Sequence, residues 1–421
     1  MASVFPLSQW LLERQSGAWG REFLRLVLVA LLVLPLMPRH AAAQSALDTG
    51  FDPQANGTVT DVAVQADGAA IITGTFTTVA GQPRNFMARV HADGSLDMGF
   101  NPNPNGPVNS IAIVGNTVYV GGSFTSVGGQ IRNRIAALDA ATGLVSAWNP
   151  NANGPVNSIA AVGSTVYVGG TFTSIGGQAR NRIAALDAAT GLATSWDPNS
   201  NNAVNTMAVA GSTVYVGGTF TSIGGQTRNR IAALDAATGL ASAWNPNANG
   251  SVNSIAAVGS TVYVGGAFTS MGGQARNRIA AIDAATGLAT SWDPSADNTV
   301  NTVAVTGSTV YAGGTFTSIG GQARNRIAAL DAVTGMPTSW NPDADNTVES
   351  MAVDGSTVYV GGAFSTIGGL ARGRIARFAP AAAPSGTAAS IPTLGEWGLV
   401  LLAGLVAAFA LTAVRKNAEA L

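Results

Sequence analysis

The stretch Thr165–Trp196 reads TVYVGGTFTSIGGQARNRIAALDAATGLATSW, and close copies of it recur along the chain at an interval of 48 residues. The interval is clearest in one tyrosine, which recurs at Tyr119, Tyr167, Tyr215, Tyr263, Tyr311 and Tyr359. A phenylalanine of the same unit recurs seven times, at Phe76, Phe124, Phe172, Phe220, Phe268, Phe316 and Phe364. A period of this length is typical of repeat architectures, so the fold follows from the structure of one unit.

One unit predicts four short β-strands. Residues 156–162 and 165–172 are rich in β-branched and aromatic residues and flank Gly163-Ser164, a two-residue hairpin signal. Residues 173–181 read as a loop, 182–187 as the third strand, and a fourth strand ends at Trp196. Four antiparallel strands repeated radially form the blades of a β-propeller. The main alternative is a β-solenoid, whose coils are usually about half this length.

The two ends of the chain predict how the ring closes. The first three strand types occur seven times, and the last set ends at Phe378 without a fourth strand. An unpartnered fourth-type strand, SALDTGF, stands at Ser45–Phe51. Pairing it with Arg372–Phe378 would remove an exposed sheet edge. The sequence therefore predicts an all-β fold, a seven-bladed β-propeller of four-stranded antiparallel blades.

Composition excludes several classes of function. Residues 44–390 contain 15 arginines, no lysine and 18 acidic residues, a net charge of −3, so no basic stripe for nucleic acid is present. The chain has no cysteine, which excludes disulfides, thiol catalysis and thiolate metal sites. Only 10% of residues are charged, but 47% are hydrophobic and strongly periodic, which indicates a folded chain.

Residues 1–43 read as a secretory signal peptide. Arginines precede an apolar run at 26–36, which is too short to span a bilayer. Small residues follow, and the A-x-A pattern predicts cleavage between Ala43 and Gln44. An uncleaved anchor is the alternative.

Several motifs resemble a known repeat family. FDPQANGTVTDVAVQADGAAIITGTFTTVAGQPRN at 51–85 and HADGSLDMGFNP at 91–102 closely resemble the bacterial delta-sixty repeat, a β-propeller repeat of unassigned function. The resemblance covers residues 45–378. Later copies shorten the first hairpin and, with a Gly-Gly doublet and a Trp, are also similar to kelch repeats.

The C-terminal region divides into three parts. Residues 379–390 form a Pro/Ala/Ser linker, and 391–421 include an uncharged run at 398–414, just long enough for a transmembrane helix. Arg415 and Lys416 then form a basic, stop-transfer end that predicts the propeller outside the inner membrane. This arrangement resembles the IPTL-type C-terminal sorting signal (IPTL-CTERM) of Gram-negative bacteria, on Ile391, Pro392, Thr393, Leu394, Glu396, Trp397 and Gly398. The resemblance implies cleavage by an exosortase-like membrane enzyme; a plain anchor is the alternative.

Recurring polar residues are expected to be structural. Paired arginines begin the third strands, and we expect them to bind carboxylates such as Asp139, Asp187 and Asp235. An arginine ring that binds an anionic polymer is the alternative. The Asn-rich connections have the 1, 3, 5 spacing of a calcium loop, but most of their ligands are neutral. Turn formation is therefore favoured, and weak calcium binding stays open at Asp293, Asp297, Asp343 and Asp345.

Catalysis finds little support in the sequence. His91 is the one histidine after the signal peptide, and no extended loop is present to build a site. We expect no cofactor and a monomeric, non-catalytic scaffold or binding module. It would be exported, held transiently at the inner membrane, and then carried to the cell surface or matrix, with a glycan or envelope protein as ligand. The alternative is a propeller enzyme acting on extracellular carbohydrate, which ionised groups at the axis would favour.

Overall fold

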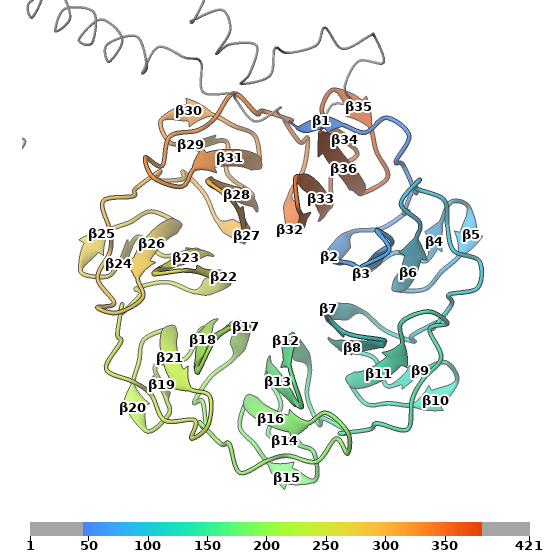
Figure 1. The fold of residues 1–421 in the computed structure, drawn as a ribbon, viewed down its shortest axis with the longest axis horizontal. Helices are drawn as coiled ribbons and strands as arrows, with labels where there is room; N and C mark the ends of the chain where they lie inside the picture. Colours follow the sequence, from blue (N-terminus) through green and yellow to red (C-terminus); the bar gives the residue numbers. More distant parts are fainter. Residues whose placement is uncertain (1–44, 381–421) are drawn as a thin grey trace, which may run out of the picture. The chain divides into compact units, whose positions relative to one another are not determined.

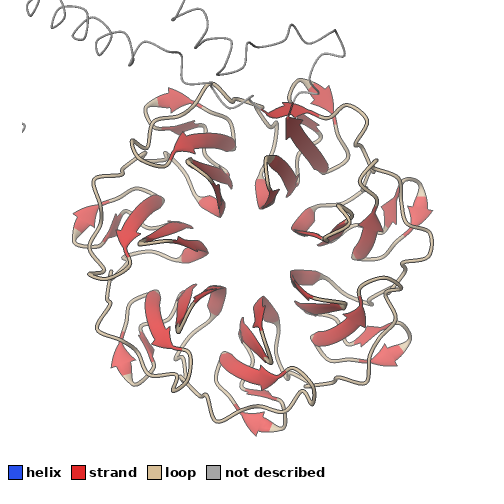
Figure 2. Ribbon diagram, in the orientation of Figure 1, coloured by secondary structure: helices blue, strands red, loops and turns tan. Residues whose placement is uncertain are grey.

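The computed structural model describes residues 45–380, which form an all-β, propeller-like fold. No helix occurs among these residues, and so none is long and apolar enough to cross a membrane (Figure 2). The predicted signal peptide, linker from residue 381, transmembrane helix and sorting signal lie outside the described residues. The last strand extends to Pro380, two residues past the predicted end of the propeller.

The described residues contain seven sheets of three or four strands, which succeed one another around a ring (Figure 1). We number them sheet 1 to sheet 7 in chain order. The first strand of each sheet lies nearest the axis: β2 Val59–Val64, β7 Val108–Val114, β12 Val156–Val162, β17 Val204–Ala210, β22 Val252–Val258, β27 Val300–Thr306 and β32 Val348–Asp354.

The second and third strands follow outward in antiparallel order. The second strands are β3 Ala70–Gly74, β8 Thr117–Gly122, β13 Thr165–Gly170, β18 Thr213–Gly218, β23 Thr261–Gly266, β28 Thr309–Gly314 and β33 Thr357–Gly362. The third strands are β6 Met87–Val90, β11 Ile135–Asp139, β16 Ile183–Asp187, β21 Ile231–Asp235, β26 Ile279–Asp283, β31 Ile327–Asp331 and β36 Ile375–Pro380.

The second strands are buried on both faces because each sheet is covered by a neighbour on either side. In β13 every residue after Thr165 is buried, which explains its continuous run of Val, Tyr and Gly. Glycine is needed where neighbours approach most closely. A Cβ on Gly169 would lie 2.4 Å from Cγ1 of Val204 in the next sheet.

The segment predicted as a loop at 173–181 forms a small hairpin instead. Gly176 and Gly177 both have positive φ, 63° and 77°, as a type I′ turn requires, and Gly-Gly is a strong signal for this turn. Equivalent hairpins occur in all seven units: β4 Thr78–Val79 with β5 Gln82–Pro83, β9 Ser126–Val127 with β10 Gln130–Ile131, β14 Ser174–Ile175 with β15 Gln178–Ala179, β19 Ser222–Ile223 with β20 Gln226–Thr227, β24 Ser270–Met271 with β25 Gln274–Ala275, β29 Ser318–Ile319 with β30 Gln322–Ala323, and β34 Thr366–Ile367 with β35 Leu370–Ala371.

The prediction of four-stranded blades is wrong for sheets 1 to 6, which have three strands each. The fourth segment meets the third strand at one isolated bridge, for example Leu186 with Ala193. The hydroxyl of Thr194 then accepts a hydrogen bond from the amide of Trp196, at 3.2 Å. This local turn directs the chain away from the sheet before a second bridge can form.

Sheet 7 alone has four strands, because the two ends of the propeller meet there. β1, Ser45–Leu47, pairs antiparallel with β36, in register Ser45 to Pro380 and Leu47 to Phe378. The predicted closure is therefore confirmed. Next to it, Arg377 binds the carboxylate of Asp48 and lies 4.8 Å from the ring centroid of Phe51.

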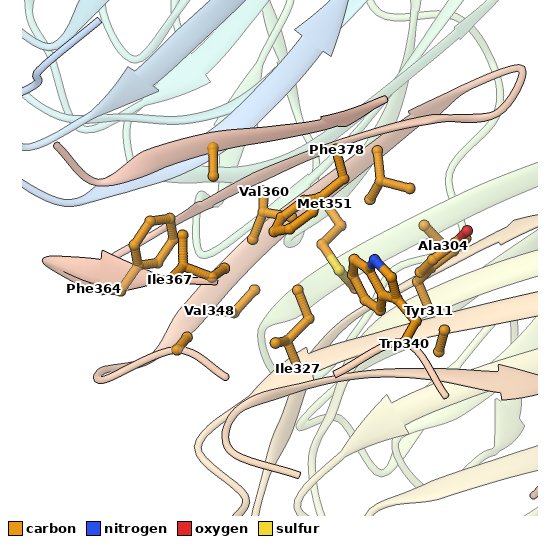
Figure 3. Close-up of a cluster of buried hydrophobic side chains, with 14 residues drawn as sticks. Ala304, Tyr311, Ile327, Trp340, Val348, Met351, Val360, Phe364, Ile367 and Phe378 are labelled. Atoms are coloured by element: carbon orange, nitrogen blue, oxygen red, sulfur yellow. The ribbon is translucent and has the colours of Figure 1, made fainter. Parts of the chain in front are cut away.

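The hydrophobic core consists of seven clusters that each join two neighbouring sheets. Figure 3 shows the cluster between sheets 6 and 7, where Trp340 and Phe378 meet edge-on at 5.1 Å between ring centroids. The tryptophans that follow the third strands of sheets 2 to 6 are buried in equivalent places, at Trp148, Trp196, Trp244, Trp292 and Trp340. Trp148, for example, donates to the Asp187 carbonyl of the next sheet at 3.1 Å. The five tryptophans therefore pack between neighbouring sheets.

Candidate functional site

Polar side chains surround the axis at one position of every first strand. A register shift in each first strand leaves one extra residue, such as Asn157 between Val156 and Ser158. These seven residues are partly exposed, and we call them the axial collar: Thr60, Asn109, Asn157, Asn205, Asn253, Asn301 and Glu349. A bulge changes the direction of the side chain at the extra residue. It therefore presents a polar group at a position that the regular alternation of the strand would not provide.

Collar side chains donate to the backbone of the next sheet. The amide of Asn109 donates to the Val156 carbonyl at 3.1 Å. Asn157 does the same to the Val204 carbonyl at 3.3 Å. These bonds join neighbouring sheets around the axis, so their first role is to hold the ring together.

Asp61 of β2 breaks the pattern of the repeat, because the other six sheets have Ser or Thr at its position. Its carboxylate accepts from the Ile111 amide in sheet 2 at 2.8 Å and from the Ser350 hydroxyl in sheet 7 at 3.0 Å. The side chain is partly exposed at the surface, but desolvation of its carboxylate raises its pKa from 3.8 to about 6, although the hydrogen bonds oppose the rise.

Glu349 is the second exception and the one carboxylate of the axial collar. Burial raises its pKa, and a 2.9 Å hydrogen bond from Asn301 opposes that rise. Glu349 precedes Ser350 on β32, so the two acidic residues come from the neighbouring first strands of sheets 7 and 1, and Glu349 contacts Asn301 of sheet 6. They are the two carboxylates with a raised pKa among residues 45–380. Neither residue was predicted as a site residue, although each differs from its counterparts when the seven copies are aligned.

Asp61 can hold a proton near pH 6, and the two carboxylates differ in how many hydrogen bonds they accept. Both side chains are partly exposed, but the two oxygens of Asp61 already accept three hydrogen bonds. The carboxylate of Glu349 accepts a hydrogen bond from Asn301 alone among the side chains near it. This arrangement suits a polar ligand at the collar better than a pair of acid and base groups.

The four candidate calcium ligands have other partners. Asp297 accepts from the amides of Thr317 and Ser318, which caps the outer hairpin of sheet 6, and Asp345 caps the hairpin of sheet 7 in the same way. Asp343 accepts from Asn325 at 2.6 Å, and Asp293 lies 3.5 Å from Arg276. Within residues 45–380 no group of three His, Asp or Glu residues could hold a metal ion.

Shallow grooves lie beside the outer hairpins, where a connection crosses from one sheet to the next. One, of about 420 Å³, is lined by Asn277 and Arg278 just before β26, by Ser295 and Asp297 of the connection, and by Ser318 and Gly321 of the hairpin. A second, of about 340 Å³, lies at the equivalent place beside Asn151 and Gln178. The grooves therefore repeat with the fold.

The paired arginines contact carboxylates in two sheets, Arg180 with Asp197 at 3.6 Å and Arg276 with Asp293 at 3.5 Å. The predicted aspartates Asp139, Asp187 and Asp235 are not their partners. Arg180 donates to the carbonyls of Ala179 and Thr194, at 2.8 and 2.6 Å. Asp187 instead accepts from the amide and hydroxyl of Thr190, at 2.7 and 2.8 Å. The aspartate closes its own turn, so it is not directed towards the arginine.

Three family models match parts of the chain. The PQQ_2 model, described as outer membrane protein assembly factor BamB, matches residues 101–245 and 132–380. A β-propeller domain of unknown function, DUF5122, matches residues 65–100, and the IPTL-CTERM motif matches residues 389–416. The last match supports a C-terminal sorting signal.

Solved structures support the fold alone, because their sequence identities are low. The computationally designed Ika8 protein is 15% identical, with a TM-score of 0.50, and the match covers 79% of this chain and 100% of that one. The WD40 β-propeller domain of Doa1 is 12% identical, with a TM-score of 0.55, covering 79% and 96%. No curated protein sequence matches the chain. Because one PQQ_2 match alone spans more than half of its residues, the chain belongs to the PQQ_2 family of β-propeller proteins.

Proposed function

We propose that the chain is an exported, surface-associated, seven-bladed propeller that acts as a non-catalytic scaffold or binding module of the cell envelope or matrix. The observation that carries the proposal is the use of the recurring polar side chains. Collar amides, loop asparagines and paired arginines bind the backbone of their own or the next sheet. Such a ring is rigid and leaves few polar groups for chemistry. The family match, to a factor named for outer membrane assembly, is in line with an envelope role.

Export and processing complete the proposal. The signal peptide would be cleaved between Ala43 and Gln44, and a membrane helix at 398–414 would hold the chain until an exosortase-like enzyme acts near residues 391–398. The IPTL-CTERM match at 389–416 supports this order. The seven copies would be repeats of the delta-sixty type with kelch-like features, and the propeller would be monomeric, without nucleic acid or cofactor.

A binding screen tests the proposal. The full chain, exported by a bacterial host, is applied to an array of envelope and matrix glycans and to isolated envelope proteins. We expect saturable binding to one class and no turnover of it. Hydrolysis of any arrayed glycan would contradict the non-catalytic role.

A carbohydrate-active enzyme is the second candidate, because Asp61 and Glu349 place two carboxylates with raised pKa near the axis. The variant Glu349→Gln, which keeps the shape of the side chain, tests this candidate. If the parent chain hydrolyses a polysaccharide and the variant does not, the enzyme is supported. If the parent chain hydrolyses no polysaccharide, this candidate is excluded.

A further inference from the structure

Five successive sheets present a large apolar side chain to solvent at the same position. The residue follows the glycine of the turn between the third strand and the fourth segment. It is between 55% and 70% exposed in each sheet, at Leu144, Leu192, Leu240, Leu288 and Met336. Sheet 6 adds Val333 in the same turn, 80% exposed. A single exposed apolar side chain is ordinary on a protein surface, but here the same position is apolar in five successive sheets, which gives one surface of the ring a repeated apolar character.

All of these turns lie at one end of the ring, together with the hairpins between first and second strands. The amide of Ala188 donates to the Ser164 carbonyl at 2.9 Å, which joins turn and hairpin in sheet 3. Ala236 and Ser212 do so in sheet 4. We call this end the turn face.

The chain enters and leaves the propeller at the same turn face. In sheet 7 Val358 pairs with Phe378, so β36 ends beside the hairpin that precedes β33. Ser45 pairs with Pro380 at this end. The hairpin is also bonded to sheet 6, where the Thr306 hydroxyl donates to the Gly355 carbonyl at 3.0 Å. The apolar turn with Val333 and Met336 belongs to the sheet next to the exit.

The distribution of these side chains suits a lipid surface better than a folded protein. Protein docking sites are contiguous apolar patches of several hundred Å². Here each of sheets 2 to 6 supplies one or two apolar side chains in its turn, between polar or small residues such as Thr190 and Gly191. A fluid interface accepts separate side chains without matching their shape, and their contributions add because all lie at one end.

We propose that the turn face lies against the surface of a lipid bilayer while the chain is membrane-anchored. This inference rests on the proposed function, since the anchor is the apolar run at 398–414. Residues 381–397, which separate Pro380 from that run, span at most about 60 Å when fully extended. The tether therefore keeps the propeller near the bilayer, and its attachment at the turn face brings that face to the lipid first.

Charge indicates which lipids fit. Each of the five turns begins with an aspartate: Asp139, Asp187, Asp235, Asp283 and Asp331. Hydrogen bonds from Thr190 lower the pKa of Asp187, so it stays ionised at neutral pH. Carboxylates repel anionic headgroups and can lie beside the ammonium group of phosphatidylethanolamine. Zwitterionic phosphatidylethanolamine is therefore the preferred surface, and phosphatidylglycerol is disfavoured.

Fluorescence quenching tests the contact, because the chain has no cysteine and a single label is unambiguous. The full chain is reconstituted in phosphatidylethanolamine vesicles that contain a headgroup quencher. It carries a fluorophore on Leu240→Cys or on Asn202→Cys. Asn202 is exposed beside the start of β17, whereas Leu240 follows the turn beside the far end of that strand, about 23 Å away along seven residues.

We expect quenching at position 240 to exceed that at position 202 at least threefold, and to fall in phosphatidylglycerol vesicles. A matched background replaces Leu144, Leu192, Leu288 and Met336 with Ser. Sheet 1 has Ser95 at this place, with the same hydrogen bond to the strand, so the turn accepts serine. An unchanged melting temperature verifies folding, and quenching at 240 should drop to the level at 202.

Equal quenching at both positions would overturn the inference, as would quenching that the serine background leaves intact. Loss of quenching on dilution of protein at constant lipid would assign the turn face to a second copy of the chain and also overturn it. The vesicle result does not depend on cleavage of the tail or on a ligand. It therefore fails or succeeds separately from the proposed processing and binding.

Discussion

The Ser350 hydroxyl donates to the Asp61 carboxylate at 3.0 Å, although 289 residues separate the two in sequence. The bond crosses the junction of sheets 7 and 1, where the ring closes. Asp61 also accepts from Ile111 in sheet 2, so one carboxylate joins three sheets. In sheet 2 the Ser110 hydroxyl accepts the corresponding amide bond, from Ile159 at 3.0 Å.

Stability should depend on pH through Asp61. Its pKa rises from 3.8 to about 6 on folding, so the folded chain holds this proton more tightly than the unfolded chain. The stabilisation is fully present below about pH 4 and is lost as pH rises to about 6. Between pH 4 and pH 8 the parent should therefore lose up to about 3 kcal/mol in the free energy of unfolding through Asp61. We predict that Asp61→Ser does not show this loss.

Urea unfolding at pH 4 and pH 8 measures this difference. Asp354→Ser, which removes an exposed carboxylate from the end of β32, is the matched control and should leave the parent pH profile unchanged. If Asp61→Ser and the parent showed the same pH dependence, the carboxylate would not be the titrating group.

Opening the ring should destabilise the propeller. Deletion of residues 44–51 removes β1, the Asp48 partner of Arg377 and the fully buried Phe51. The edge of β36 would then be unpaired and available for association. We predict a lower melting temperature and concentration-dependent oligomers by analytical ultracentrifugation. A variant that stays monomeric and melts like the parent would refute this view of the closure.

The tryptophans should have equal and separable contributions. Trp196→Ala should cost about 3–5 kcal/mol in the free energy of unfolding, because a large buried side chain is lost. Trp196→Phe keeps most of the packing against Tyr167 and loses the 3.0 Å bond to the Asp235 carbonyl, so it should cost about 1 kcal/mol. Denaturant unfolding of the Trp148 and Trp244 variants should agree. A stable alanine variant at one site would make that site a ligand-stacking candidate.

Two glycines of one sheet should respond differently to alanine. A Cβ on Gly169 would meet Val204 of the next sheet at 2.4 Å, so Gly169→Ala should cost at least about 1–3 kcal/mol through overpacking. Gly177 has open space around it but a φ of +77°, so Gly177→Ala should cost about 1 kcal/mol through backbone strain. Thermal melting of both variants measures this order, and a reversed order would contradict the close approach of the sheets.

The sequence predicted the repeating sheets and the closure well, because both follow from periodicity. β-Branched runs separated by Gly-Ser turns and an unmatched strand at residue 45 are local signals. The length of the fourth strand could not be predicted in the same way. It depends on the hydroxyl of Thr194, which accepts a hydrogen bond from the amide of Trp196 in place of a bond from that amide to the sheet.

The candidate site was harder to predict, because it lies in exceptions to the repeat. Asp61 and Glu349 differ from the common residues of the unit, so the repeat pattern does not predict them. The partners of Arg180 were also missed, since a backbone carbonyl such as that of Thr194 leaves no trace in composition. The recurring residues therefore build the ring, whereas Asp61, which differs from its counterparts, joins sheet 1 to sheet 7.

The mature form of the protein tests the central claim most directly. Mass spectrometry of the chain from its native host measures both ends and the fraction in which they occur. The account predicts an N-terminus at Gln44 and a C-terminus within residues 391–398, in the surface or extracellular fraction. A C-terminus still at Leu421 in the membrane fraction would contradict release by a sorting enzyme and leave a permanently anchored propeller.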